Sequence, residues 1–227
     1  MNRTEINRIL SSPVEKSVAS RGANPAAVWM DREGALEKGV RRCEAIFRMI
    51  EAQRPFTVLD VGCGLGFAVP FLEERYGSIA GRYLGIDVSE PLVAEARRLW
   101  STHRFEVRDI AANPMPGCSF DYTALNGVLT AKNSLSHEAM ENFAYQLLEC
   151  SWLATGEAMS FNVMSPHVDW TRDDLFHWPL DRAAAFCVSK LSRNINIIAD
   201  YGLYEYTVQV FRTSRSQGDV PLGWEPR

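Results

Sequence analysis

The sequence has few cysteines, and no apolar run is long enough to cross a bilayer. The five cysteines are scattered and none forms a C-x-x-C pair, so the sequence predicts neither a zinc site nor a disulfide framework. The first ten residues, MNRTEINRIL, lack the apolar stretch of a secretory leader, and no segment approaches the ~18 apolar residues of a membrane span. We therefore expect a reduced, soluble, cytoplasmic protein without a membrane partner.

The sequence also has no excess of positive charge. Lys and Arg number 24 against 28 Asp and Glu, for a net charge of -4. This balance argues against a protein that binds nucleic acid by neutralising many phosphates, so we expect no DNA substrate. Hydrophobic residues at 46% and charged residues at 23% are ordinary for globular chains and exclude disordered and fibrous classes. The length of 227 residues suits a single domain, and a homodimer is left open.

Strand and helix patterns alternate through most of the chain. Short apolar runs predict strands at 56–61, 83–88, 105–109, 120–125 and 157–163, and helical spacing predicts helices over 31–51, 67–76, 90–100, 137–153 and 181–191. Two last strands, 196–200 and 204–211, are joined by too few residues for a parallel crossover. The pattern predicts an α/β domain over 31–212 with a doubly wound, mainly parallel sheet and a C-terminal antiparallel hairpin. We expect residues 1–30 to form an irregular arm with one short helical pattern at 6–10, and 213–227 to form a polar tail.

A glycine turn follows the first predicted strand, where ligands of such sheets bind. It reads Asp60-Val-Gly62-Cys-Gly64-Leu-Gly66, and Asp87 closes the next strand 21 residues later, where a carboxylate can accept both ribose hydroxyls. The glycines are spaced G-x-G-x-G rather than the G-x-G-x-x-G of dinucleotide sites. A carboxylate at Asp60 would repel a pyrophosphate but suit an ammonium group. The turn therefore predicts a ligand with adenosine at one end and an α-amino acid at the other.

Four segments together resemble the class I S-adenosylmethionine-dependent methyltransferases: VLDVGCGLGF (58–67), YLGIDVSE (83–90), FEVRDIA (105–111) and FDYTALNGVLT (120–130). The resemblance implies a Rossmann-like fold and S-adenosylmethionine as cofactor. It also implies a cofactor site, in which Gly62, Gly64 and Gly66, with Cys63 as a small filler, line the methionine part and Asp60 fixes its amino group. Asp87 would hold the ribose, Val88 would pack on the adenine, Asp109 beside Ile110 would accept the adenine amine, and Asn126-Gly127 would lie under the methionine backbone.

The loop after the fifth predicted strand is a candidate wall of the acceptor site. Residues 164–178 hold two of the four histidines, three acids and three aromatic residues, more than a bland surface loop carries. His167 or His177 is a candidate general base, and Asp169 can orient a histidine or bind an acceptor hydroxyl. The alternative for each is a residue that merely caps or packs. Further candidates for contact with the acceptor are Trp29, Trp170, Asn194 and Tyr201.

The sequence of the same loop is similar to that of bacterial methyltransferases that modify polysaccharides or secondary metabolites. This resemblance implies a hydroxyl or amine of a sugar or small metabolite as acceptor. Residues 1–30 are expected to close over the site when ligand binds, since excluding water would aid the displacement. We expect no metal site.

Two alternatives remain. A nicotinamide-dependent oxidoreductase is disfavoured by the glycine spacing, by Asp60 and by the lack of a Tyr-x-x-x-Lys pair after the fourth strand. A non-catalytic subunit that binds S-adenosylmethionine would carry the same acids, so the sequence does not separate it from an enzyme.

Overall fold

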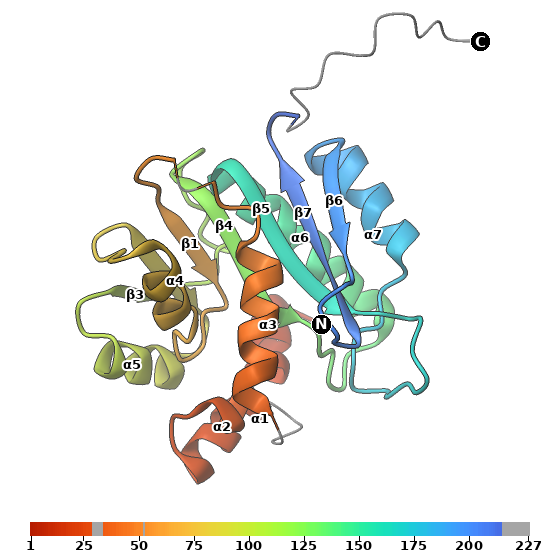
Figure 1. The fold of residues 1–227 in the computed structure, drawn as a ribbon. Helices are drawn as coiled ribbons and strands as arrows, with labels where there is room; N and C mark the ends of the chain where they lie inside the picture. Colours follow the sequence, from red (N-terminus) through yellow and green to blue (C-terminus); the bar gives the residue numbers. More distant parts are fainter. Residues whose placement is uncertain (29–33, 52, 215–227) are drawn as a thin grey trace, which may run out of the picture.

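The computed structural model describes residues 1–28, 34–51 and 53–214. Seven strands form one sheet in the order β3-β2-β1-β4-β5-β7-β6 (Figure 1). They are β1 (Val58–Val61), β2 (Tyr83–Asp87), β3 (Arg104–Val107), β4 (Phe120–Leu129), β5 (Thr155–Met164), β6 (Asn194–Ile198) and β7 (Glu205–Phe211). β1 to β5 are parallel, whereas β7 is antiparallel to both of its neighbours. This topology confirms the predicted fold class.

Helices lie on both faces of the sheet (Figure 1). They are α1 (Arg3–Arg21), α2 (Pro25–Val28), α3 (Ala35–Phe47), α4 (Ala68–Tyr76), α5 (Glu90–Leu99), α6 (His137–Ala154) and α7 (Leu180–Phe186), which continues as a π-helical turn, Cys187–Leu191. Ser89 and Ser136 cap α5 and α6 by accepting the backbone N–H of Leu92 and Ala139. Within the described ranges, no helix is both long and apolar enough to cross a bilayer.

The two faces of the sheet bury separate apolar clusters. On one face, Leu59, Leu84 and Leu125 pack with side chains of α6 and α7. On the other, Val58 and Tyr83 pack with side chains of α3, α4 and α5. β1 and β2 are buried along their whole length, as expected for parallel strands covered on both sides. The ends of these central strands are therefore held rigidly.

The expectation of an irregular N-terminal arm is wrong, because α1 is a helix of 19 residues that continues through Pro13. A proline inside a helix leaves the carbonyl four residues earlier without its usual donor. Here the side-chain amide of Asn133 donates to that carbonyl, Ile9 O, at 2.9 Å. Val18 of α1 then packs with Leu65 and Leu92, so the helix lies against the carboxyl-end edge of the sheet.

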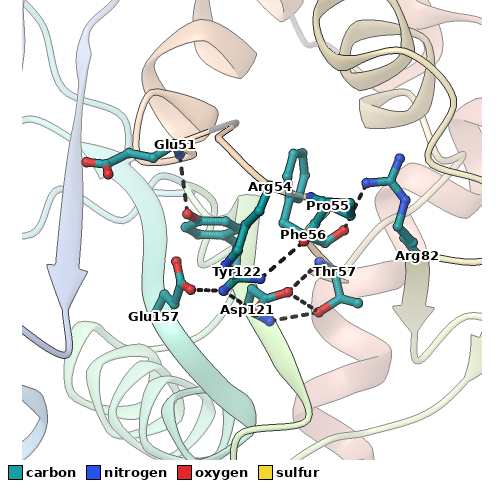
Figure 2. Close-up of polar contacts among 9 residues, drawn as sticks. All are labelled: Glu51, Arg54, Pro55, Phe56, Thr57, Arg82, Asp121, Tyr122 and Glu157. Atoms are coloured by element: carbon teal, nitrogen blue, oxygen red, sulfur yellow. Dashed lines mark hydrogen bonds and ion pairs between the residues drawn. The ribbon is translucent and has the colours of Figure 1, made fainter.

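A polar network ties the chain together at the opposite, amino-end edge of the sheet (Figure 2). Asp121 accepts hydrogen bonds from the backbone N–H and hydroxyl of Thr57, at 2.7 and 2.8 Å, and from Arg54 at 2.9 Å. Arg54 also pairs with Glu157. These contacts join the segment before β1 to the starts of β4 and β5, so they stabilise the fold at a distance from the strand ends that carry the candidate site.

Candidate functional site

The glycine turn after β1 has a backbone that only glycine adopts readily. Gly62, Gly64 and Gly66 all have positive φ, at 71°, 51° and 74°. A Cβ at Gly62 would lie 2.3 Å from a methyl carbon of Val128, and one at Gly66 would lie 2.8 Å from the rings of Phe105 and Trp100. At Gly64, by contrast, the space around a Cβ is open. The turn is packed tightly from behind and leaves its middle accessible to a ligand.

Asp60 is a buried carboxylate in which only one of the two oxygens accepts a hydrogen bond from the described residues. Its side chain is 2% exposed, and Oδ2 accepts the hydroxyl of Tyr83 at 2.7 Å. Oδ1 is buried and has no hydrogen-bond partner in the described part of the chain. Burial raises the pKa of Asp60 to about 7; the hydrogen bond from Tyr83 opposes this shift, and the charge of Asp87 adds to it. A buried oxygen without a donor fits the ammonium group of an amino-acid ligand.

Asp87, at the end of β2, braces the glycine turn. Its Oδ2 accepts the backbone N–H of Gly64 and its Oδ1 that of Ser89, both at 2.9 Å. Burial raises the pKa of Asp87, backbone hydrogen bonds from Ser89, Gly64 and Val88 lower it, and the charge of Glu15 on α1 raises it further. The neighbouring Val88 is 38% exposed, which leaves an apolar surface beside the carboxylate. Such a surface suits a flat aromatic ring.

Asp109, in the turn after β3, is held by α1. Its Oδ2 accepts Arg3 Nε at 2.5 Å and Asn7 Nδ2 at 2.7 Å, and its Oδ1 accepts the N–H of Ala111 at 3.0 Å. Burial alone would raise the pKa of Asp109, but the hydrogen bonds from Arg3 and Asn7 hold it below its ordinary value. Ile110 is buried behind it. The acid predicted to contact the adenine is thus covered by the N-terminal helix, a contact that no sequence pattern indicated.

Asn126 and Gly127 lie inside β4 rather than after it, in a bulge. Leu125 pairs with Phe161 and Leu129 with Val163, so β4 advances four residues while β5 advances two. Gly127 has φ 83°. Its backbone N–H donates to the side chain of Asn162 at 2.7 Å, and Asn126 donates to Cys43 Sγ at 3.4 Å.

Sequence reasoning missed Asn162 and Glu205, which support this bulge. Asn162 Nδ2 donates to Glu205 Oε2 at 2.5 Å, and Arg42 Nε donates to the same oxygen at 2.9 Å. A second N–H of Arg42 donates to Glu205 Oε1. Asn162 is fully buried and Glu205 is 6% exposed. A polar Asn inside the apolar run FNVM was the one available signal, because an amide in a buried strand needs partners.

His177 lies at the carboxyl end of β5, in a segment that bridges to Met164. Its Nδ1 is 2.7 Å from the carbonyl oxygen of Ser165. A carbonyl only accepts, so Nδ1 carries a proton and the lone pair of the neutral ring lies on Nε2. Nε2 is buried and has no hydrogen-bond partner among the described residues. The ring of Trp170, 39% exposed, lies perpendicular to the imidazole with centroids 6.4 Å apart.

The structure brings only some of the other acceptor candidates to this edge. Tyr201 lies there, in the turn between β6 and β7, and is 8% exposed. His167 and Asp169 are exposed in the loop after β5. Asn194 begins β6 and pairs with the last residue of β7, at the amino-end edge, so the structure does not bring it to the site. Trp29 lies outside the described residues. Within the described residues no group of three potential ligands that could hold a metal ion is found.

Comparison with known proteins finds similarity to methyltransferases. A family model described as a methyltransferase domain matches residues 58–149, from β1 into α6. A Mycobacterium tuberculosis protein described as a candidate methyltransferase is 31% identical over 175 residues, which cover 74% of this chain and 99% of that protein.

Solved structures share the fold. The magnesium protoporphyrin IX methyltransferase of Synechocystis, with bound S-adenosylhomocysteine, has a TM-score of 0.66 at 11% identity and covers 93% of this chain and 100% of its own. The 1,6-didemethyltoxoflavin N1-methyltransferase of Burkholderia thailandensis has a TM-score of 0.63 at 17% identity. The match covers 94% of this chain and 92% of that chain.

Proposed function

Because this chain belongs to the class I S-adenosylmethionine-dependent methyltransferases, we propose that it methylates a hydroxyl or amine of a small molecule, with sugars and secondary metabolites as the substrate class. The observation that carries the proposal is His177, whose Nε2 is a solvent-shielded acceptor at the end of β5. The Burkholderia methyltransferase, which shares the fold, was crystallised with a small-molecule acceptor, and this likeness of fold supports the proposal by analogy.

The residues around the glycine turn fit the cofactor. We assign the unpartnered Oδ1 of Asp60 to its ammonium group, the open backbone at Gly64 to its methionine chain and Asp87 to its ribose. Val88 supplies an exposed apolar contact for the adenine, and Asp109 accepts the adenine amine when α1 moves aside. S-adenosylmethionine supplies a sulfonium-bound methyl group with a good leaving group, so the protein mainly has to align the acceptor and keep water out.

A hydroxyl or ammonium acceptor holds its proton near neutral pH and needs a base. The hydrogen bond from Nδ1 to Ser165 fixes the His177 ring, so that Nε2 takes the acceptor proton as the methyl group is transferred. Trp170 stands beside the imidazole and forms a wall against which an acceptor can pack. His167 and Asp169 are more exposed, so we assign them to the rim of the site rather than to proton transfer.

We assign α1 the role of a lid over the cofactor. It contacts Asp109 through Arg3 and Asn7 and places Glu15 near Asp87, so two of the three acids predicted to hold the cofactor face this helix. A ligand that reaches these acids needs α1 to move, and the helix then re-covers the site.

The experiment is conversion of S-adenosylmethionine to S-adenosylhomocysteine with a panel of sugars, phenols and amines. His177→Gln should lower kcat by about 10²–10⁴-fold on the best acceptor, because the base is lost, and leave the affinity for S-adenosylhomocysteine unchanged. The same substitution at His167 should have little effect, which decides between the two histidines.

Full activity of His177→Gln would show that His177 is not the general base. S-adenosylhomocysteine binding without turnover on any acceptor would favour the non-catalytic binding subunit.

A further inference from the structure

A buried polar chain connects three elements to the bulge in β4. Arg42 on α3 forms a two-point ion pair with Glu205 at the start of β7. Glu205 accepts the amide of Asn162 on β5, and Asn162 accepts the backbone N–H of Gly127. We define this chain, Arg42–Glu205–Asn162–Gly127, as the bulge clamp. Each side chain is fixed by the next, so the orientation of the Asn162 amide is determined.

The bulge needs such a support. Because β4 and β5 fall out of register after Leu125, the N–H of Gly127 points to a side chain instead of to a backbone carbonyl of β5. A buried amide without an acceptor costs more than its hydrogen bond contributes when made. Arg42 also closes the space above the bulge, since a Cβ on Gly127 would lie 2.8 Å from Nη1 of Arg42. Asn162 and Arg42 therefore hold Gly127 from two sides.

The bulge in turn touches the glycine turn. A Cβ on Gly62 would lie 2.3 Å from a methyl of Val128, so Val128 packs directly against the Gly62 backbone. Asn126 donates to Cys43 Sγ, and the charge of Asp60 adds to the effect of burial in raising the pKa of Cys43 to about 12. Ala124 of β4, two residues before Asn126, pairs with Asp60 of β1, so the bulge lies close to Asp60.

The order of the strands decides which end of a ligand the bulge affects. Asp60 on β1 pairs with Ala124 of β4 on one side and with Gly85 of β2 on the other. The bulge begins two residues beyond Ala124, and Asp87 lies at the end of β2, on the far side of β1. The bulge thus borders the Asp60 end of the site, and Asp87 borders the opposite end.

We propose that Asn162 and Glu205 are positioning residues for the amino-acid end of the cofactor: the bulge clamp sets the place of the Gly127–Val128 backbone, and through it the place of Gly62 beside Asp60. This inference rests on the proposed cofactor site. It assigns a role to a buried cluster that lies outside the glycine turn.

The test compares two probes that share the adenosine group. S-adenosylhomocysteine carries the amino-acid end, and 5′-methylthioadenosine lacks it. Asn162→Leu removes both hydrogen bonds of the amide and should weaken S-adenosylhomocysteine binding roughly tenfold, the equivalent of one to two lost hydrogen bonds, while 5′-methylthioadenosine binds as to the wild type. Calorimetric titration of both probes gives the ratio of the two affinities directly.

Two further variants make the result decisive. Glu205→Gln keeps the shape of the clamp but removes the charge that Arg42 pairs with. It should therefore weaken S-adenosylhomocysteine binding relative to 5′-methylthioadenosine binding, but by less than Asn162→Leu does. It replaces Asn162→Leu if that variant does not fold. Gln209→Leu is the matched control, because Gln209 is a buried amide on the same strand β7 and donates to Ala45 O of α3 at 3.0 Å, away from the bulge. Its ratio of affinities should equal that of the wild type.

The outcomes separate the clamp from the cofactor site itself. Equal weakening of both probes by Asn162→Leu, or no weakening of either, would overturn the positioning role and leave the cofactor assignment intact. A wild-type protein that binds neither probe would instead overturn the proposed cofactor site.

Discussion

Asp60 offers the sharpest test of the site, because the burial of its ionised carboxylate should lower the free energy of unfolding of the ligand-free protein. Its carboxyl is 2% exposed and has one oxygen without a donor, so ionisation in the folded protein is unfavourable. Asp60→Asn keeps the size of the side chain and an acceptor for the Tyr83 hydroxyl but removes the charge. We expect this variant to be more stable than the wild type at pH 8 and to bind S-adenosylhomocysteine more weakly.

The magnitude follows from the pKa. Burial raises the pKa of Asp60 from 3.8 to about 7 in the folded protein. Since the folded state holds this proton more tightly than the unfolded state, the free energy of unfolding falls as pH rises from the unfolded pKa toward 7. Each pH unit in this window costs about 1.4 kcal/mol, so the full loss above pH 7 is about 4 kcal/mol as an upper bound. Between pH 5.5 and 8 the loss is about 2 kcal/mol.

The assay is urea unfolding of the ligand-free protein at pH 5.5 and pH 8. The stability of Asp60→Asn relative to the wild type should increase by about 2 kcal/mol between the two pH values. Asp121→Asn is the matched control, because burial would raise the pKa of Asp121 but the hydrogen bonds from Thr57 and Arg54 hold it below its ordinary value. That variant should be less stable than the wild type at both pH values, with a difference that does not change between them.

Ligand affinity should show the opposite pH dependence to stability. The ammonium group of S-adenosylhomocysteine needs an ionised Asp60, so the affinity of the wild type should rise as pH increases from 6 toward 8, and Asp60→Asn should lose this dependence. An Asp60→Asn protein that is less stable than the wild type at pH 8, or a stability difference that is the same at both pH values, would refute the argument from burial.

Two further predictions concern the other acids. Asp87→Ala should abolish measurable S-adenosylhomocysteine binding in calorimetry, because it removes the ribose acceptor and the brace on the N–H of Gly64 together; retained binding would contradict the assignment of Asp87. Arg3→Ala should release α1 from Asp109 in the ligand-free protein, so that S-adenosylhomocysteine associates several-fold faster in stopped flow and protease cleaves residues 1–30 faster. Unchanged association and unchanged cleavage would show that α1 is no lid.

The parts of the fold that could be predicted are those with local causes. Apolar runs of four to six residues predicted the central strands because buried parallel strands need no polar alternation. The glycine turn and the acids at the carboxyl ends of β1, β2 and β3 could be predicted because each lies at or next to a strand end. α1 was missed because Pro13 marks a helix break locally, whereas the donor that compensates for it, Asn133, lies 124 positions away from Ile9. A donor that distant is invisible to any short window.

The same reason explains which parts of the site could not be predicted. The bulge clamp joins residues separated by 163 positions, from Arg42 to Glu205, and by 43, from Asn162 to Glu205. The register shift that makes the bulge depends on how β4 and β5 pair, which the sequence of β4 alone does not determine. Asn194 was placed at the site because it flanks a strand, but antiparallel pairing puts it at the other edge.

The three acids of the site are held in three different ways, and this difference determines what a ligand has to change. Asp87 already accepts two backbone N–H groups, and Asp109 already accepts two side chains of α1. Asp60 alone has an oxygen without a donor. In the proposed site, binding therefore gains most at the amino-acid end, where an ammonium group would relieve a buried charge. It has an unfavourable term at the adenine end, where α1 would have to give up its contacts. The affinity for the whole cofactor depends on both, so an ionised Asp60 supplies free energy that helps to displace the helix from Asp109.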